Sequence, residues 1–448
     1  MRDFARSDDA RVSRQLDRLA ALSLPQGRLS LAPIREILSR LGDPQLRLPP
    51  VFHIAGTNGK GSTAAFLTAM LEAGGKTVHK YTSPHLVRYN ERIRIAGRLI
   101  DDAMLADVLS EVIDASEDIG ASFFEVTTAA AFLAFARTPA DACVLEVGLG
   151  GRFDATNVIE TAAICAIASL GIDHEAFLLA PEDGVPTDPA ARIAFEKAGI
   201  IKPGVPVVTQ AYPDGERREI VRAASVAGAP LHMRGDDWDA ALGTALDYRD
   251  GHGALVLPPP GLPGMHQADN AALAVAMLRH QDHVTVGDDA MAAGMTDARW
   301  PARMQRLSDG PLAEILPGAT LWLDGGHNLD AARAIAAFLK ERDRPCIAIM
   351  GMLANKDARG FIAVLAPHLS GMASVPIPGH EHHDPAQLSE LARTHGIAAR
   401  HGAPTVEAAL RAIAKDRRSG DPYTGDLLIC GSLYLAGEVL RANGTVPD

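Results

Sequence analysis

The chain has few of the features that mark exported, membrane-bound or nucleic-acid-binding proteins. Its 448 residues include only four cysteines, aromatic residues make up 5% of the composition, and no run of lysine and arginine is longer than a pair. The net charge is −12, so a surface for nucleic acid or for an anionic membrane is not expected. An anionic ligand must then be held by local charges at its own site.

Long apolar runs are also missing. No stretch reaches the roughly 20 apolar residues that a membrane span needs, and the start MRDFARSDDARVSRQ is charged, with no apolar stretch behind it. We therefore expect a cytoplasmic protein that contacts no membrane. The cysteines lack the C-x-x-C spacing of a metal or redox site and are expected to be reduced core residues. They are Cys143, Cys165, Cys346 and Cys430.

The most informative feature present is the run HIAGTNGKGST at residues 53–63. A buried strand is expected over residues 50–54 and an apolar helix over residues 63–73, so a glycine-rich turn joins strand to helix. Its glycines allow backbone N–H groups to converge on phosphate oxygens, Lys60 adds a mobile positive charge, and the helix adds its N-terminal dipole. The turn therefore predicts binding of a nucleoside triphosphate.

The spacing of this turn differs from the common phosphate-loop pattern. G-x-x-x-x-G-K-[ST] would need a glycine at Ile54 and a hydroxyl residue at Gly61, one position before Ser62. The turn is thus a shortened variant in which Ser62 or Thr63 can reach a magnesium ion, and an ordinary strand-to-helix loop is the alternative. The residues expected at the nucleotide are Gly56, Thr57, Asn58, Gly59, Lys60, Gly61 and Ser62.

Short apolar runs alternate with helical stretches along the whole chain. The first set of runs begins near residues 51, 142, 162 and 205, and the second near residues 320, 346, 372 and 426. This alternation is typical of mostly parallel sheets covered by helices. The length favours two domains. We expect an α/β domain with a P-loop-type sheet over residues 1–298 and a smaller Rossmann-like α/β domain over residues 299–448, with the hinge near Trp300 and Pro301.

Polar clusters follow several predicted strands, which is where ligands bind in an open parallel sheet. The segment YTSPHLVRYNER at 81–92 contains Ser83, which can coordinate a metal beside the phosphate loop, although a solvated loop is the alternative. The segment EVGLGGRFD begins with Glu146, a natural magnesium ligand, and the alternative is a glycine-rich turn without a ligand. Asp173 and His174 supply further possible ligands, but a lone histidine is more often structural.

Four other segments are less specific by pattern alone. Lys197 resembles a solvated helix residue, and the acidic, proline-rich residues 180–189 indicate a surface loop. In the second half, LDGGHN at 323–328 places an acid, an imidazole and an amide after a strand, where they can close over the nucleotide. The histidines of residues 379–384 match no helix or strand face, so a solvated loop is preferred to a metal site.

Taken in order, these motifs resemble those of the folylpolyglutamate synthases and bifunctional dihydrofolate synthases, the folate branch of the Mur ligase superfamily. GTNGKGST is shared in style with the Mur enzymes. Five segments are specific to the folate branch: TSPHLVRYNERI, FFEVTTAAAF, EVGLGGRFDATN, EKAGIIKPG and ARWPARMQ. The resemblance covers about residues 28–440. It implies an N-terminal domain that binds ATP and the pterin and a C-terminal glutamate-ligase domain.

The resemblance also implies a reaction. The carboxylate of dihydropteroate or of a reduced folate takes the γ-phosphate of ATP, and the amine of L-glutamate attacks the resulting acyl phosphate. Two Mg²⁺ ions are implied, the first held by Ser83 and Glu146 and the second by His174 with Glu146. Lys197 matches a lysine that is carbamylated in this family, which replaces its pattern-based interpretation. Lys60, Lys197 and His174 would be the catalytic residues of a monomeric enzyme.

Further positions follow by motif. Asn270 and Arg303 would contact ATP from the hinge region, and Asp324 and His327 from the second domain. The pteroate pocket would be lined by Phe124, Asp154 and Ala155, with residues 27–31 as the covering loop.

Three features differ from the usual family pattern: Leu329 replaces a proline, Gly326 replaces an alanine, and residues 180–189 lengthen the loop before Lys197. The alternatives are a folylpolyglutamate synthase without the dihydrofolate synthase activity, a Mur-type ligase for a UDP-linked sugar peptide, and a regulatory nucleotide-binding protein without catalysis.

Overall fold

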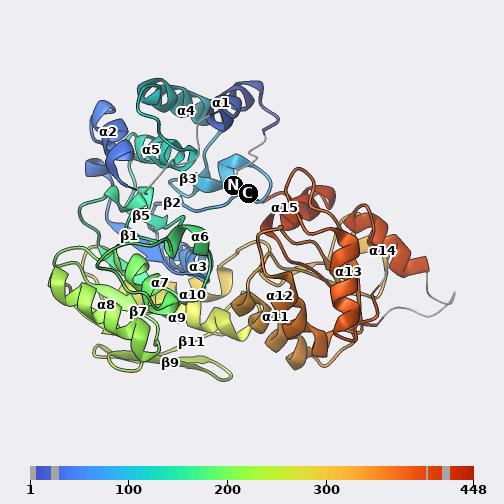
Figure 1. Ribbon diagram of the computed structural model, residues 1–448. Coiled ribbons are helices and arrows are strands. Elements are labelled where there is room, and N and C mark those ends of the chain that lie inside the picture. Colours follow the sequence, from blue (N-terminus) through green and yellow to red (C-terminus); the bar gives the residue numbers. More distant parts are fainter. Residues whose placement is uncertain (1–6, 22–29, 400–401, 416–423, 448) are drawn as a thin grey trace. The chain divides into compact units, whose positions relative to one another are not determined.

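A computed structural model describes residues 7–21, 30–399, 402–415 and 424–447 (Figure 1). The chain divides into two compact units. The first runs to Gly261 and continues over Gln267–Arg299, and the second comprises Leu262–His266 and Trp300–Pro447. Each unit is built around its own sheet, as the two sets of apolar runs predict.

An eight-stranded sheet forms the centre of the first unit, in the order β4-β3-β2-β5-β1-β6-β7-β8. Strands β2, β5, β1, β6, β7 and β8 are parallel, while β3 and β4 form an antiparallel edge. The strands are β1 (Val51–Ala55), β2 (Val78–Tyr81), β3 (Ile93–Ile95), β4 (Arg98–Leu99), β5 (Ala142–Glu146), β6 (Ile164–Ile167), β7 (Val207–Thr209) and β8 (Leu231–Met233). The central strands β1, β5 and β6 are buried at every residue, as expected when helices cover both faces.

Helices cover this sheet, and α3 (Lys60–Ala73) directly follows the phosphate loop. It begins at Lys60 rather than at Thr63 as predicted, and ten of its 14 residues are buried. The remaining helical segments of the unit are α1 (Ala10–Ala20), α2 (Ala32–Arg40), η1 (Pro44–Arg47), η2 (Tyr89–Arg92), α4 (Asp102–Ser116), α5 (Phe123–Ala136), η3 (Ala155–Val158), α6 (Glu175–Leu178), α7 (Pro189–Ala198), α8 (Asp214–Ala227), α9 (Met265–Arg279) and α10 (Asp288–Asp297). Helix α10 packs directly on α3, because Gly294 has no Cβ to meet the backbone of Met70.

The sequence did not predict a small antiparallel sheet that follows the large one. It consists of β9 (Trp238–Leu242), β10 (Leu246–Asp250) and β11 (Gly253–Leu257) in the order β11-β10-β9. Buried and exposed residues alternate at the start of β9 and β10, which is the period-two signal of a half-buried strand. Trp238 and Tyr248, which face the same side, stack with ring centroids 5.9 Å apart.

The second unit contains a five-stranded sheet in the order β12-β13-β16-β14-β15, parallel except for β12. Its strands are β12 (Gln305–Leu307), β13 (Thr320–Leu323), β14 (Cys346–Met350), β15 (Gly371–Ser374) and β16 (Asp426–Cys430). Its helical segments are η4 (Ala313–Ile315), α11 (Leu329–Arg342), α12 (Ala358–Leu365), η5 (Ala366–His368), α13 (Pro385–Thr394), α14 (Val406–Lys415) and α15 (Leu433–Ala442). The fold class expected from the sequence is therefore confirmed for both units.

Two compositional expectations can also be compared with the structure. All four cysteines are buried and free, which confirms the prediction of reduced core residues. Among the described residues, no helix has the length and apolar character needed to cross a membrane. The segment 180–189 is irregular up to Asp188, and Pro189 already opens α7, with the Asp188 side chain accepting a hydrogen bond from the N–H of Ala191.

Candidate active site

The phosphate loop lies at the carboxyl end of β1, in the middle of the large sheet. Gly56 and Gly59 have φ values of +154° and +84°, which favour glycine. A Cβ at Gly56 would come within 2.9 Å of the Cβ of Ala168, and a Cβ at Gly59 would collide with the amide oxygen of Asn270. The loop backbone is thus pressed against its neighbours, and the structure places Asn270, on α9, directly beside Gly59.

The segment that follows β6 holds the phosphate loop in place by hydrogen bonds. The sequence analysis did not identify this segment. The backbone N–H of Thr57 donates to the carbonyl oxygen of Ser169 at 2.7 Å, and its hydroxyl donates to that of Gly171 at 2.7 Å. The Ser169 hydroxyl donates to the carbonyl of Asn58 at 3.2 Å. The available signal was Ser169, a polar residue two positions after the buried strand β6.

Two lysines converge on the loop. Lys60 Nζ donates to the carbonyl oxygens of Gly56 at 2.9 Å and Thr57 at 3.2 Å. Lys197 Nζ, from the last turn of α7, donates to the same Gly56 oxygen at 2.9 Å. Lys197 is only 4% exposed, so its pattern-based interpretation as a solvated helix residue is wrong. The pattern within α7 gives no sign of what packs on the helix. The loop after β5 covers its last turn, which contains Lys197.

Burial changes the acidity of Lys197. The pKa of Lys197 is lowered to about 7, chiefly by burial and also by the positive charge of Lys60, while Asp173, Asp154 and Glu196 act in the opposite direction. A buried amine near another cation is more easily deprotonated, because its charged form loses hydration and meets repulsion. The lowered pKa therefore increases the share of Lys197 that is present as an uncharged, nucleophilic amine.

Glu146 and Ser83 come together at the same edge of the sheet. Glu146 is the last residue of β5, pairs with Ile54 of β1 and is 5% exposed. The N–H of Ser83, two residues beyond β2, donates to Glu146 Oε2 at 3.3 Å. Lys80, which the sequence did not single out, is buried on β2, and burial lowers the pKa of Lys80 to about 8 while Glu146 acts to raise it. The carboxylate and the serine expected at the first metal are thus neighbours.

His174 occupies a different kind of position. It is exposed, has φ +55° and precedes the short helix α6, where its carbonyl accepts from the N–H groups of Phe177 and Leu178 at 3.0 Å each. Its neighbour Asp173 lies close enough to Lys197 to influence the pKa of that residue. Among the described residues, no three or more His, Cys, Asp or Glu side chains form a group able to hold a metal ion. A site made of one carboxylate, a hydroxyl and phosphate oxygens does not need such a group.

The predicted pterin residues lie around the glycine-rich loop after β5. The ring of Phe124 occupies the space that a Cβ at Gly148 would need. Asp154 is buried and accepts hydrogen bonds from the N–H of Leu149 at 2.8 Å and the hydroxyl of Thr156 at 2.5 Å, and burial raises the pKa of Asp154. Ala155 begins η3 and is buried. Asp154 thus holds the loop in shape. Residues 27–29 of the expected covering loop lie outside the described residues.

In the second unit, Arg303, Asp324 and His327 gather around Gly325. The residues before and after Arg303, Ala302 and Met304, both have positive φ (+55° and +41°), a strained conformation for non-glycine residues.

Hydrogen bonds hold this strained segment in place. Met304 N–H donates to Asp324 Oδ2 at 2.8 Å, and Gly325 N–H donates to the carbonyl of Ala302 at 2.9 Å. His327 Nδ1 lies 3.2 Å from the Gly325 oxygen, and an Arg303 guanidinium nitrogen lies 3.1 Å from where a Gly325 Cβ would be. The strand end of β13 therefore presents three of the predicted residues together.

Ser432 is a further candidate that the sequence did not identify. It follows β16, the neighbour of β13, and caps α15 by accepting from the N–H of Tyr434 at 3.2 Å. The signal was again a small polar residue after a buried strand. The histidines at 380, 382 and 383 are half-buried rather than solvated: His380 stacks on Tyr434 at 3.9 Å, and His383 Nε2 lies 2.9 Å from the carbonyl oxygen of Lys356.

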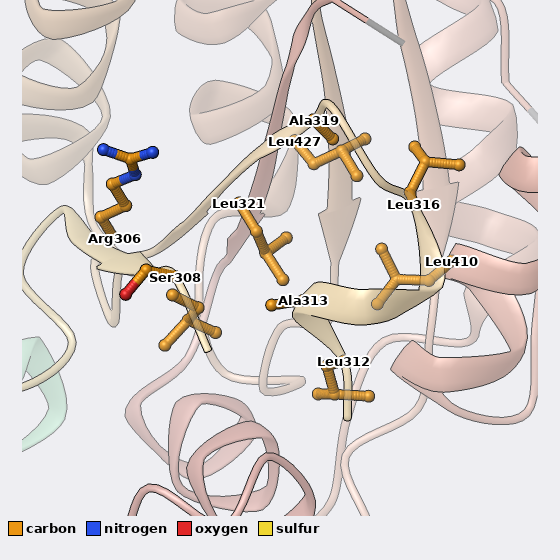
Figure 2. Close-up of a pocket in the computed structure, with 10 residues that line it drawn as sticks. Arg306, Ser308, Leu312, Ala313, Leu316, Ala319, Leu321, Leu410 and Leu427 are labelled. Atoms are coloured by element: carbon orange, nitrogen blue, oxygen red, sulfur yellow. The ribbon is translucent and has the colours of Figure 1, made fainter. Parts of the chain in front are cut away.

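Figure 2 shows a small cavity in the second unit. Its volume is about 70 Å³, whereas ligand pockets usually measure roughly 300 to 1,000 Å³. Its lining comprises Arg306, Leu307, Ser308, Leu312, Ala313, Leu316, Ala319, Leu321, Leu410 and Leu427, none of them a predicted site residue. The cavity is therefore smaller than a usual ligand pocket.

Comparisons with known proteins show which family the chain belongs to. Residues 302–432 match the family described as Mur ligase, glutamate ligase domain. The chain is 33% identical to folylpolyglutamate synthase of Lacticaseibacillus casei over 431 residues, which are 91% of this chain and 92% of that protein. The chain belongs to the folylpolyglutamate synthase and dihydrofolate synthase family. It is thus an acid–amino-acid ligase of the Mur type, as the resemblance implied.

Solved structures of family members agree with this assignment. Escherichia coli FolC in complex with DHPP and ADP matches with a TM-score of 0.83 and 31% identity, covering 96% of this chain and 97% of that one. The Yersinia pestis bifunctional enzyme, solved with AMPPNP and a Mn ion, matches with a TM-score of 0.82 and 32% identity, covering 96% and 97%. Binding of an adenine nucleotide and a divalent metal is therefore established among family members with this fold.

Proposed function

We propose that the protein uses ATP to add L-glutamate to 7,8-dihydropteroate and to reduced folates, through an acyl phosphate. The observation that carries this proposal is the convergence of Lys60 and Lys197 on the Gly56 carbonyl, within a phosphate loop that family membership associates with ATP. The acceptor's carboxylate oxygen attacks the γ-phosphorus and ADP leaves. The glutamate amine then attacks the acyl carbon, and phosphate leaves with formation of the amide.

The protein's part in the first step is positioning and charge neutralisation. Lys60 can swing from its present carbonyl partners to the β- and γ-phosphates, and the N–H groups at the start of α3 face the same region. Phosphoryl transfer needs little covalent chemistry from the enzyme and depends on such electrostatic stabilisation. On this account Gly56, Thr57, Asn58, Gly59, Gly61 and Ser62 hold the phosphates, with Asn270 beside them.

Glu146 and Ser83 would hold Mg²⁺, and their geometry suits it. A buried carboxylate at a strand end, beside a serine and next to the phosphate loop, supplies the oxygen ligands that Mg²⁺ prefers. When bound, the ion would neutralise charge on the phosphates. His174, with Glu146, would serve a second ion.

Carbamylation of Lys197 fits its environment. The reaction joins the neutral amine nitrogen to the carbon of CO2 and releases one proton to water, which leaves an anionic carbamate. Only the uncharged amine can react, and burial provides it by holding the pKa of Lys197 at about 7. The carbamate would then be a metal ligand close to the Gly56 loop.

The remaining assignments complete this proposal. Arg303, Asp324 and His327 of the second unit would contact ATP, and Phe124, Asp154 and Ala155 would line the pteroate pocket. We propose that the protein is a cytoplasmic monomer with both dihydrofolate synthase and folylpolyglutamate synthase activity. Its two proposed domains comprise residues 1–298 and 299–448.

Two measurements test the proposed reaction. ADP release should require ATP, Mg²⁺, L-glutamate and a folate acceptor together, and binding of ATP without any glutamate-dependent release would favour a regulatory nucleotide-binding protein. With an acceptor carrying oxygen-18 in its reacting carboxylate, one labelled oxygen should appear in the inorganic phosphate. Unlabelled phosphate would overturn the acyl-phosphate route.

A further inference from the structure

Four charged side chains form a closed ring next to Lys197. Arg152 contacts Glu182 at 2.6 Å and Glu196 at 2.8 Å, and Arg192 contacts the same two carboxylates at 3.0 Å each. Arg192 and Glu196 have side chains 6% exposed, Glu182 13% and Arg152 23%. The charges alternate and sum to zero, so each guanidinium is neutralised by two carboxylates in a largely dry environment.

The ring joins two neighbouring segments to a loop that lies 30 or more residues earlier in the sequence. Arg152 belongs to the glycine-rich loop after β5, Arg192 and Glu196 to α7, and Glu182 to the irregular segment before α7. The lengthened segment 180–189 is therefore more than a surface loop, because Glu182, the least exposed of its acids, completes the ring.

Backbone contacts lie directly beneath the ring. The N–H of Arg152 donates to the carbonyl of Glu196 at 2.8 Å. A Cβ on Gly151 would come within 2.7 Å of that carbonyl oxygen and 3.0 Å of the Cα of Lys197. The backbone of the loop after β5 thus contacts the backbone of the last turn of α7 at Lys197, whose side-chain amine donates to Gly56.

The segment before α7 has a second anchor on the same loop. Leu178, at the end of α6, is 4% exposed, and its side chain lies 2.9 Å from where a Cβ at Gly150 would be. The stretch from His174 to α7 is therefore held by Leu178 on Gly150 and by Glu182 on Arg152.

We propose that Glu182 is a positioning residue for Lys197, which rests on the proposed function. Without the Glu182 carboxylate, Arg152 and Arg192 would share Glu196 alone, and one largely buried guanidinium would lack a full counter-charge. The ring would open to hydrate that group, and the last turn of α7 would lose its fixed position against the loop after β5. Lys197 Nζ would then no longer be held at the Gly56 carbonyl.

The test compares Glu182→Gln with a matched control, Glu219→Gln. Glu219 pairs with Arg222 at 2.9 Å on α8, and the Arg222 guanidinium lies 5.3 Å from the aromatic ring of Phe195 on α7. The control therefore removes a nearby carboxylate that is not one of the four charged side chains of the ring. Each full-length protein is equilibrated with carbon-13 bicarbonate, and three quantities are measured: the carbamate NMR signal, kcat, and KM for ATP.

For Glu182→Gln we expect kcat to fall about tenfold or more and the carbamate signal to weaken at fixed bicarbonate. The KM for ATP should stay within about threefold of the wild-type value, because the phosphate loop is unchanged. Glu219→Gln should match the wild type. A ring that only stabilises the fold would lower the unfolding temperature and leave kcat and the signal of the folded enzyme unchanged, and this result would overturn the proposal. If Glu182→Gln does not fold, Glu182→Asp keeps the charge with a shorter reach and should show the same effects more weakly.

The proposed function fails in a different way. If wild type shows no carbamate signal and Lys197→Ala keeps full activity, the role of Lys197 is wrong whatever Glu182 does. If Lys197→Ala is inactive and Glu182→Gln is as active as wild type, only the positioning role is overturned.

Discussion

Lys60 and Lys197 donate hydrogen bonds to one and the same atom, the carbonyl oxygen of Gly56, at 2.9 Å each. The two amines come from α3 and α7, which follow different strands of the large sheet. This shared partner places a mobile cation and an easily deprotonated amine at the first residue of the phosphate loop. It connects the loop that family membership associates with ATP to the residue that we propose is carbamylated.

Lys60→Ala should abolish turnover. The γ-phosphate would lose its nearest cation in the transition state, at a cost of several kcal/mol. The measurement is glutamate-dependent ADP release, with Lys340→Ala, an exposed lysine on α11, as the control. Near-normal activity of Lys60→Ala would contradict the phosphate-loop assignment.

Lys197→Ala should be inactive, and a small carboxylate such as acetate should restore part of the activity. The variant removes the amine that becomes the carbamate, and acetate can supply an oxygen anion in the space left behind. Activity is measured over a series of acetate concentrations, with chloride at equal ionic strength as the control. Full activity without acetate would rule out a carbamate role.

Gly151→Ala should lower both activity and stability. The new methyl group would meet the carbonyl oxygen of Glu196 at 2.7 Å and force α7 away from the loop. Gly215→Ala is the matched control, because that position on α8 has no neighbouring atom within 4 Å and is helical, so alanine should be neutral or slightly stabilising. Equal unfolding temperatures and equal kcat for the two variants would contradict the close packing at Gly151.

Stability should fall in mild acid because of His280. Its ring stacks on His232 at 4.0 Å, lies 5.4 Å from His252 and approaches Asp250 at 3.5 Å. The pKa of His280 is lowered to about 4, chiefly by burial and also by the neighbouring His232, His252 and Arg279, while Asp250 opposes them. The unfolded chain binds a proton near the usual histidine pKa and the folded protein does not, so stability decreases as the pH falls from about 6.5 to about 4.

The test is thermal unfolding between pH 7 and pH 4.5 for wild type and His280→Gln. The variant should show a shallower loss of unfolding temperature over this range, whereas His283→Gln, at an exposed position, should follow the wild type. An unchanged pH dependence in His280→Gln would show that His280 does not carry the effect.

Local signals in the sequence were sufficient for much of the fold. The apolar runs near 51, 142, 320 and 426 became parallel strands, because continuous burial on both faces leaves a recognisable pattern over five residues or so. The glycine-lysine turn was recognisable because phosphate loops need those residue types. The sheet over residues 238–257 was missed, although its alternating pattern was present.

Relationships between distant segments could not be read from the sequence. The burial of Lys197 depends on Gly151, 46 positions earlier by residue number, and the ring around Arg152 depends on Glu182 from an irregular segment. The shape of the Arg303 segment depends on hydrogen bonds to Asp324 and Gly325 from another strand end. Family resemblance suggested the role proposed for Lys197, whereas its helical pattern alone indicated a solvated residue.

The most direct test of the account is ADP release by the purified protein with ATP, Mg²⁺ and L-glutamate, comparing 7,8-dihydropteroate, tetrahydrofolate and no acceptor. We predict release with both acceptors and none without an acceptor, together with a glutamylated product in each case. Activity with tetrahydrofolate alone would contradict the bifunctional assignment and leave a chain-extending folylpolyglutamate synthase. Silence with both acceptors would contradict the proposed substrates and favour a Mur-type ligase for a UDP-linked sugar peptide.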